Sequence, residues 1–291
     1  MAGSAARSAT IESKAKMLAT KGVDVRMAKA FQSSMLRASP SETLAVRHAG
    51  TVAWFTLNRP NKCNALSVGL NQALLDACAA LAPATAVVVL EGAGRHFCAG
   101  SDLLDLYQVD REEARRVLQL ETDACHALAA LPQLTVAILH GKCHGGGAIL
   151  PLYCDLRLGR PGVEFSLPEG SLGWAPPYGI ERMEASLRRP FVLDMLLSGR
   201  TCGDREALRQ GWINHLLGPD PDAEVPYLDQ LAQRSPAVLR ETIALTAPKN
   251  LARMRAADEK ALATFLNHFD TDQARAHIAR FVERKRPPAS P

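Results

Sequence analysis

Strand-like and helix-like patterns alternate between residues 52 and 139, and this alternation limits the chain to a few folds. Apolar runs rich in β-branched residues at 52–57, 87–90 and 134–139 have the composition of buried strands. Between them, residues 67–82 and 112–131 repeat apolar side chains at the three- and four-residue spacing of amphipathic helices. The alternation predicts an α/β body with a buried, mostly parallel sheet.

The two ends of the chain differ from this body. The 291 residues have a formal charge of +4, and residues 1–40 alone contribute +5 through seven basic and two acidic side chains. We expect residues 1–40 to form a basic extension, a tail in preference to an organelle-targeting leader. Residues 41–220 then form the core, and residues 221–291, which show only helical spacing, form a helical region.

Composition excludes several classes of protein. The body has almost no net charge, which argues against a nucleic-acid partner, and its apolar runs are far shorter than the roughly 20 residues of a membrane helix. Seven cysteines without a CxxC pair or zinc-ligand spacing favour a cytoplasmic, reducing compartment and no metal.

Glycines cluster in two loops that each follow a predicted strand. A dinucleotide-binding motif at residue 92 fails because Phe97 stands at its third glycine, and a serine-hydrolase interpretation of the glycines after His144 lacks a GxSxG nucleophile. Either loop alone is more commonly a tight turn. Together, the free amides of residues 98–101 and 145–147 are able to bind an oxyanion.

The order of short motifs resembles the enoyl-CoA hydratase/isomerase (crotonase) superfamily over residues 41–287. The matching blocks are LNRP at 57–60, NAL at 64–66, HFCAGSDL at 96–103, residues 141–147, CD at 154–155, FSLPE at 165–169, LSGR at 197–200, GWIN at 211–214 and FVERKRP at 281–287.

This resemblance implies a crotonase-like spiral of ββα units and a C-terminal helical trimerisation region, assembled as a trimer or a dimer of trimers. It also implies an enzyme of fatty-acid metabolism that binds an acyl thioester of coenzyme A, or of an acyl-carrier protein, and needs no further cofactor. The oxyanion hole would be the amides of Ser101 and Gly146. Substrate-binding residues carried over by position are Lys62, Ala65, Cys98, Ala99, Asp102, Leu103 and Leu104.

The acid–base residues distinguish reactions within the family. Hydratases of this family use two glutamates, but here the first position holds Ile149, and only the second, Glu169, is kept. Hydration needs an acid and a base, whereas moving a double bond from C3 to C2 needs one base. We therefore expect Glu169 to be the catalytic base of an enoyl-CoA isomerase.

Other reactions stay open at this stage. Hydratases or dehydratases, decarboxylases and thioester hydrolases share the fold, and a noncatalytic CoA-binding scaffold would explain the missing glutamate. Ile149, Trp174 and Tyr178 are predicted to shape the acyl pocket, with Tyr178 as a candidate proton donor, although a packing role for the two aromatic residues is slightly favoured.

Overall fold

The computed structural model describes residues 43–107, 109–220, 222–246 and 250–285, and its architecture confirms the predicted α/β class. The predicted extension at residues 1–40 lies outside the described residues, and the boundaries at residues 40 and 220 stay predictions. The strands are β1 (Leu44–Ala49), β2 (Val52–Leu57), β3 (Val87–Gly92), β4 (Leu134–Leu139), β5 (Lys142–His144), β6 (Leu156–Gly159), β7 (Glu164–Ser166), β8 (Cys202–Gly203) and β9 (His215–Leu216).

Helices occupy most of the remaining described chain. They are α3 (Val68–Ala79), α4 (Arg111–Ala130), α5 (Gly146–Ile149), α6 (Glu169–Leu172), α7 (Ile180–Ser186), α8 (Arg189–Ser198), α9 (Asp204–Gln210), α10 (Val225–Ala232), α11 (Pro236–Leu245), α12 (Leu251–Phe269) and α13 (Asp272–Lys285), with 3₁₀ turns η1 (Pro60–Lys62) and η2 (Leu150–Tyr153). Ser67 caps α3 by accepting a 3.3 Å hydrogen bond from the Leu70 amide, because this amide has no partner within the helix.

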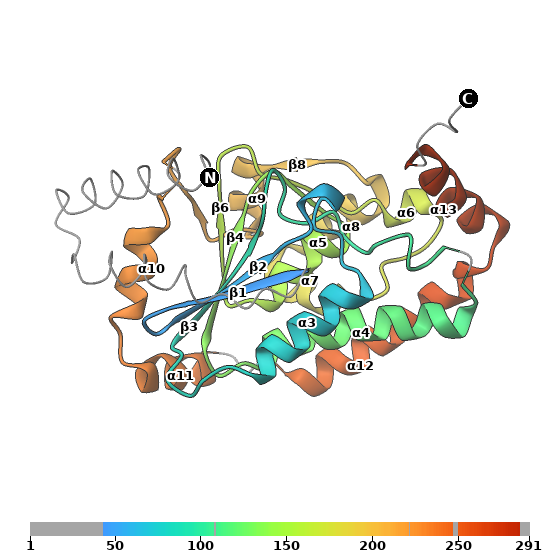
Figure 1. The fold of residues 1–291 in the computed structure, drawn as a ribbon. Helices are drawn as coiled ribbons and strands as arrows, with labels where there is room; N and C mark the ends of the chain where they lie inside the picture. Colours follow the sequence, from blue (N-terminus) through green and yellow to red (C-terminus); the bar gives the residue numbers. More distant parts are fainter. Residues whose placement is uncertain (1–42, 108, 221, 247–249, 286–291) are drawn as a thin grey trace, which may run out of the picture.

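The larger sheet has six strands in the order β1-β2-β3-β4-β6-β9. Strands β1, β2, β3, β4 and β6 of this sheet are labelled in Figure 1. Strand β1 pairs antiparallel with β2 through a tight hairpin, and each later neighbour pairs parallel. Helices α3 and α4 lie in the connections from β2 to β3 and from β3 to β4, as parallel pairing requires.

Both faces of this sheet are buried, which explains why its central strands are apolar almost throughout. Alternate residues such as Phe55 and Leu90 point toward α3 and α4, whereas Trp54 and Val89 point toward α10 and α11. The strand pleat therefore divides each run between two helical layers.

A second sheet, with the order β5-β7-β8, is the element that positions the site. Strands β5 and β7 run parallel, with His144 opposite Ser166, so the segments that follow these two residues leave the same edge of the sheet side by side.

The described C-terminal part is helical after β9, as predicted. Its last two helices, α12 and α13, are divided at Asp270. Helix α12 packs along α4, and α13 lies beside α6 (Figure 1). A separate apolar cluster, which includes Trp174, Phe265 and Phe269, joins these helices to the core.

Candidate active site

Parallel backbone bridges bring the predicted glycine loops together. Leu66 pairs with Ser101, Cys98 pairs with Cys143, and β5 pairs with β7. The Leu66 amide donates to the Gly100 carbonyl over 2.8 Å, and the His144 amide donates to the Cys98 carbonyl over 3.0 Å. The segments containing Ser101 and Gly146 are thus held at one edge of the small sheet.

Glycine is required where the loops meet. Gly100 has φ +88°, and a Cβ there would lie 2.7 Å from the His144 carbonyl oxygen and 3.0 Å from the Gly146 nitrogen. The predicted oxyanion amides therefore lie on facing loops. Within the described loops, no backbone hydrogen bond uses the amide of Ser101 or Gly146. Both N–H groups are available to a ligand oxygen, which is the arrangement an oxyanion hole needs.

Glu169 lies against the second glycine loop. It starts the short helix α6, three residues after β7 ends at Ser166. A Cβ on Gly145 would be only 3.0 Å from Glu169 Oε1, so the carboxyl directly covers this glycine. The side chain is 6% exposed, and its Oε2 is buried with no hydrogen-bond partner among the described residues. A buried oxygen of this kind is free to face a substrate.

A second buried carboxyl lies beside Gly146, where the sequence prediction placed none. Glu121 comes from the middle of α4, and its Oε1 accepts hydrogen bonds from Ser101 Oγ at 2.9 Å and from the Tyr178 hydroxyl at 2.5 Å. A Cβ on Gly146 would lie 2.7 Å from this same oxygen. The glycine loop is therefore flanked by two carboxyls that come from different elements.

Burial controls the protonation of both carboxyls. Desolvation raises the pKa of Glu169 to about 7, and a charge on Glu121 raises it further. Desolvation likewise raises the pKa of Glu121 to about 7, against the lowering effect of the hydrogen bonds from Tyr178 and Ser101. Near neutral pH, each glutamate is able to hold or release a proton.

Residues predicted to shape the acyl pocket occupy different environments. Ile149 is fully buried and packs closely on Gly179. A Cβ on Gly179 would collide with the Ile149 side chain. Tyr178 is also buried, and its hydroxyl is the one that contacts Glu121. Trp174 instead packs its ring against Phe265 of α12, with centroids 5.2 Å apart, which fits the packing role left open for it.

The predicted CoA-binding segments lie next to each other. The Ala99 amide donates to the Cys63 carbonyl over 2.9 Å, which places residues 62–66 along residues 98–104. Asp102 accepts from the Leu104 amide and forms a 2.9 Å ion pair with Arg59, so it stabilises the loop. Three of the predicted contacts, Lys62, Ala99 and Leu104, are exposed, Ala65 and Leu103 are half-buried, and Cys98 is fully buried.

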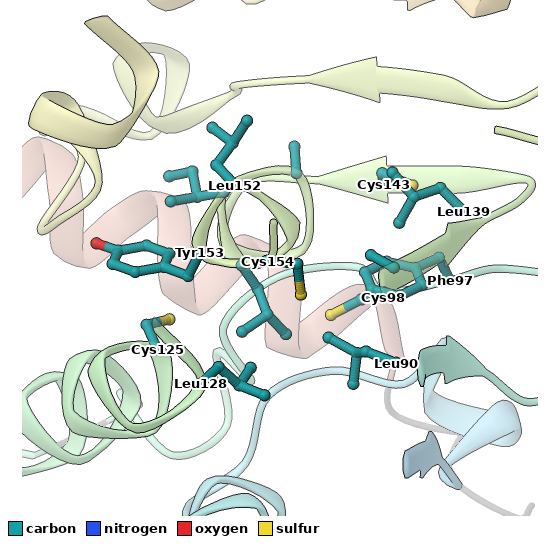
Figure 2. Close-up of a cluster of buried hydrophobic side chains, with 14 of the residues drawn as sticks. Leu90, Phe97, Cys98, Cys125, Leu128, Leu139, Cys143, Leu152, Tyr153 and Cys154 are labelled. Atoms are coloured by element: carbon teal, nitrogen blue, oxygen red, sulfur yellow. The ribbon is translucent and has the colours of Figure 1, made fainter. Parts of the chain in front are cut away.

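Cysteine chemistry is not supported at this site. Figure 2 shows Cys98, Cys143 and Cys154 among apolar side chains of the core. Burial raises the pKa of the Cys98 thiol to about 12, so the thiol stays protonated and packs in the core. In the described part of the chain, no cluster of metal-ligating side chains is found, and no helix is long and apolar enough to cross a membrane.

Glu121 is the residue that sequence reasoning missed. The sequence did indicate that Glu121 is buried, because it follows Val117 and precedes Cys125 at four-residue spacing. The apolar side of α4 consists of Val117, Leu118, Cys125 and Leu128. A glutamate on a buried helix face is rarely unpartnered, and such a position marks a candidate functional group.

Facing amides beside buried carboxyls are the groups that oxyanion stabilisation and proton transfer require. The family model for enoyl-CoA hydratase/isomerase matches residues 47–290. The chain belongs to this family, and it is an enzyme of the enoyl-CoA hydratase/isomerase class.

Individual relatives agree with this assignment. A hydroxycinnamoyl-CoA hydratase-lyase of Pseudomonas fluorescens is 30% identical over 213 residues, which cover 68% of this chain and 76% of the relative. The crystal structure of an enoyl-CoA hydratase from Mycobacterium avium is 28% identical, with a TM-score of 0.72 over 86% of this chain and all of that one. An enoyl-CoA hydratase/isomerase structure from Mycobacterium paratuberculosis, at 22% identity, has a TM-score of 0.76 over 83% of this chain and 99% of that one. The crotonase-like fold is therefore confirmed.

Proposed function

We propose that this enzyme moves the double bond of an enoyl thioester from C3 to C2, with Glu169 as the base that takes the C2 proton. The observation that carries this proposal is the buried Glu169 carboxyl, with its free Oε2, beside the glycine loop that holds the Gly146 amide. Its pKa of about 7 suits a base at neutral pH, because a base is most effective when its pKa is near the working pH.

The thioester carbonyl would accept hydrogen bonds from the Ser101 and Gly146 amides. When the C2–H bond breaks, its electron pair moves into the carbonyl, and the negative oxygen is stabilised by these two donors. The electron pair then returns from the oxygen, and C4 takes a proton from a carboxylic acid of the site, so that the dienolate becomes the 2-enoyl thioester. One such donor contributes on the order of 100-fold or more in rate.

The substrate would be a thioester of coenzyme A, or of the same arm on a carrier protein, lying along residues 98–104 with Lys62 near its phosphates. No cofactor is needed for proton transfer alone. We place the enzyme in a trimer or a dimer of trimers, which light scattering would test.

Hydration of a 2-enoyl thioester is the second candidate, and one specific observation favours it. Adding water needs both an acid and a base, and Glu121 is a second buried carboxyl beside Gly146. The fully buried apolar Ile149 favours isomerisation instead, because it offers water no hydrogen-bond partner at the position where hydratases of the family have a glutamate.

Paired incubations distinguish these reactions. The purified enzyme is given a 3-enoyl-CoA and a 2-enoyl-CoA of equal chain length, and products are separated by chromatography and identified by mass. Conversion of the 3-enoyl thioester, abolished in Glu169→Gln and kept in Glu112→Gln, supports the proposal. Glu112 is an exposed glutamate of α4 and serves as the matched control. Hydration of the 2-enoyl thioester without isomerisation contradicts it.

A further inference from the structure

Glu121 is a buried carboxyl that the single-glutamate mechanism does not use. Its side chain is fully buried in the middle of α4, and its Oε2 has no hydrogen-bond partner within the described ranges. Its two hydrogen bonds come from hydroxyl groups, the Asn71 side chain and the Asp105 carboxyl also lie near enough to affect its pKa, and none of its hydrogen bonds comes from a cation. A buried carboxyl whose second oxygen has no partner is uncommon in a protein core and marks a candidate functional group.

The neighbours of Glu121 hold it in one position. Ser101 Oγ and the Tyr178 hydroxyl both donate to Oε1, and so leave Oε2 free. The position of Tyr178 is set in turn by the next residue, since the Gly179 amide donates to Asp258 Oδ1 over 2.8 Å. Asp258 is itself held from α4 by His126 and from η2 by Tyr153. A group that must transfer a proton needs this kind of fixed orientation.

The two glutamates flank consecutive glycines. Glu169 Oε1 lies 3.0 Å from where a Cβ on Gly145 would be, and Glu121 Oε1 lies 2.7 Å from where a Cβ on Gly146 would be. The Gly146 amide is one of the proposed oxyanion donors. The charge on Glu121 also raises the pKa of Glu169, so the two carboxyls interact electrostatically. Because like charges repel, a charge on Glu121 favours the protonated form of Glu169.

From this geometry we infer that Glu121 is a second catalytic residue, which gives the proton to C4 while Glu169 takes the proton from C2. The inference rests on the isomerase activity proposed above. In this mechanism a carboxyl from α4 supplies the acid that is missing at Ile149. Ser101 and Tyr178 are its positioning residues.

Both proton transfers balance over one turnover. Glu169 carboxylate gains the proton from C2 as the C2–H bond breaks. Protonated Glu121 loses its proton to C4 as the new C–H bond forms, and becomes a carboxylate. The resting state returns when Glu169 releases its proton to solvent and Glu121 takes one up. The proton at C4 is therefore not the one removed from C2.

Isotope labelling tests this consequence directly. The enzyme, in excess, converts 3-enoyl-CoA carrying two deuterium atoms at C2 in ordinary water, and the label in the product is located by mass spectrometry and NMR. We expect one deuterium retained at C2 and none at C4. Glu121→Gln keeps the acceptor for Ser101 and Tyr178 but has no transferable acid proton, so we expect a loss of about 100-fold or more in rate. Glu112→Gln on the same helix is the control.

A second measurement separates a catalytic defect from a folding defect. Exchange of the C2 hydrogens of a saturated acyl-CoA in deuterium oxide needs Glu169 only, so Glu121→Gln should retain it within about twofold, whereas Glu169→Gln should lose it. Deuterium at C4 in the wild-type product would overturn the inference about Glu121 but not the proposed isomerase. The same follows if Glu121→Gln keeps the rate and the label pattern of the wild type. Absence of any wild-type conversion would overturn the proposed isomerase, and the inference with it.

Discussion

The Tyr178 hydroxyl donates a 2.5 Å hydrogen bond to the Glu121 carboxyl, although the two residues are separated by 57 positions in the chain. This contact joins α4 to the loop before α7. It also places a phenol and a carboxyl over Gly146, next to an amide proposed to hold the thioester oxygen.

Substitution of Glu169 by Gln should lower kcat/KM for the 3-enoyl thioester by about 100- to 10,000-fold, because the C2 base is lost. Binding of a saturated acyl-CoA should remain within about threefold, since the amides and the CoA-binding segments are unchanged. Steady-state kinetics and calorimetric titration measure the two effects. Loss of binding equal to the loss of rate would argue against a role in proton transfer.

The pH profile of kcat/KM should be bell-shaped with its maximum near pH 7. Below the pKa of about 7, Glu169 becomes protonated and is no longer a base, so the rate falls as pH is lowered. Above the pKa of about 7, Glu121 becomes ionised and is no longer an acid, so the rate falls as pH is raised. Glu121→Gln should lose the alkaline fall, and an unchanged profile in that variant would contradict this assignment.

Glu169→Gln should be more stable than the wild type in alkaline buffer. In the unfolded chain the carboxyl ionises near its ordinary value of 4.5, whereas in the folded protein it resists ionisation up to a pKa of about 7. The folded state therefore loses stability as pH rises through this window. We expect a gain of about 1 to 3 kcal/mol in the free energy of unfolding at pH 8, shrinking toward pH 5. Denaturant unfolding at the two pH values measures it, with Glu112→Gln unchanged at both.

Gly146→Ala should reduce turnover by about 100-fold while the protein stays folded, because a small misplacement of a catalytic group costs about this much in rate. The added Cβ would lie 2.5 Å from the Tyr178 hydroxyl and 2.7 Å from Glu121 Oε1, so both groups must move away from the glycine loop. Gly203→Ala is the matched control, because a Cβ there meets no atom within 4 Å. Equal kinetics for the two variants would show that the position of Glu121 has no bearing on turnover.

The sequence determined the local structure for reasons that act over short distances. Short apolar runs predicted the strands of the sheet, and apolar residues at helical spacing predicted α4, because both patterns depend only on residues close together in the sequence. The glycine loops and Glu169 were also recognisable, since their motifs are continuous in the chain.

Tertiary structure alone decided what Glu121 does. Periodicity places Glu121 on the apolar side of α4, but it does not say which part of the chain that side will face. Packing of α4 against the 98–101 loop and the 174–179 segment brought Ser101, Tyr178 and Glu121 together from three separate elements. Burial at that junction then raised the pKa of the carboxyl to about 7, because desolvation depends on what surrounds a group and not on its neighbours in sequence.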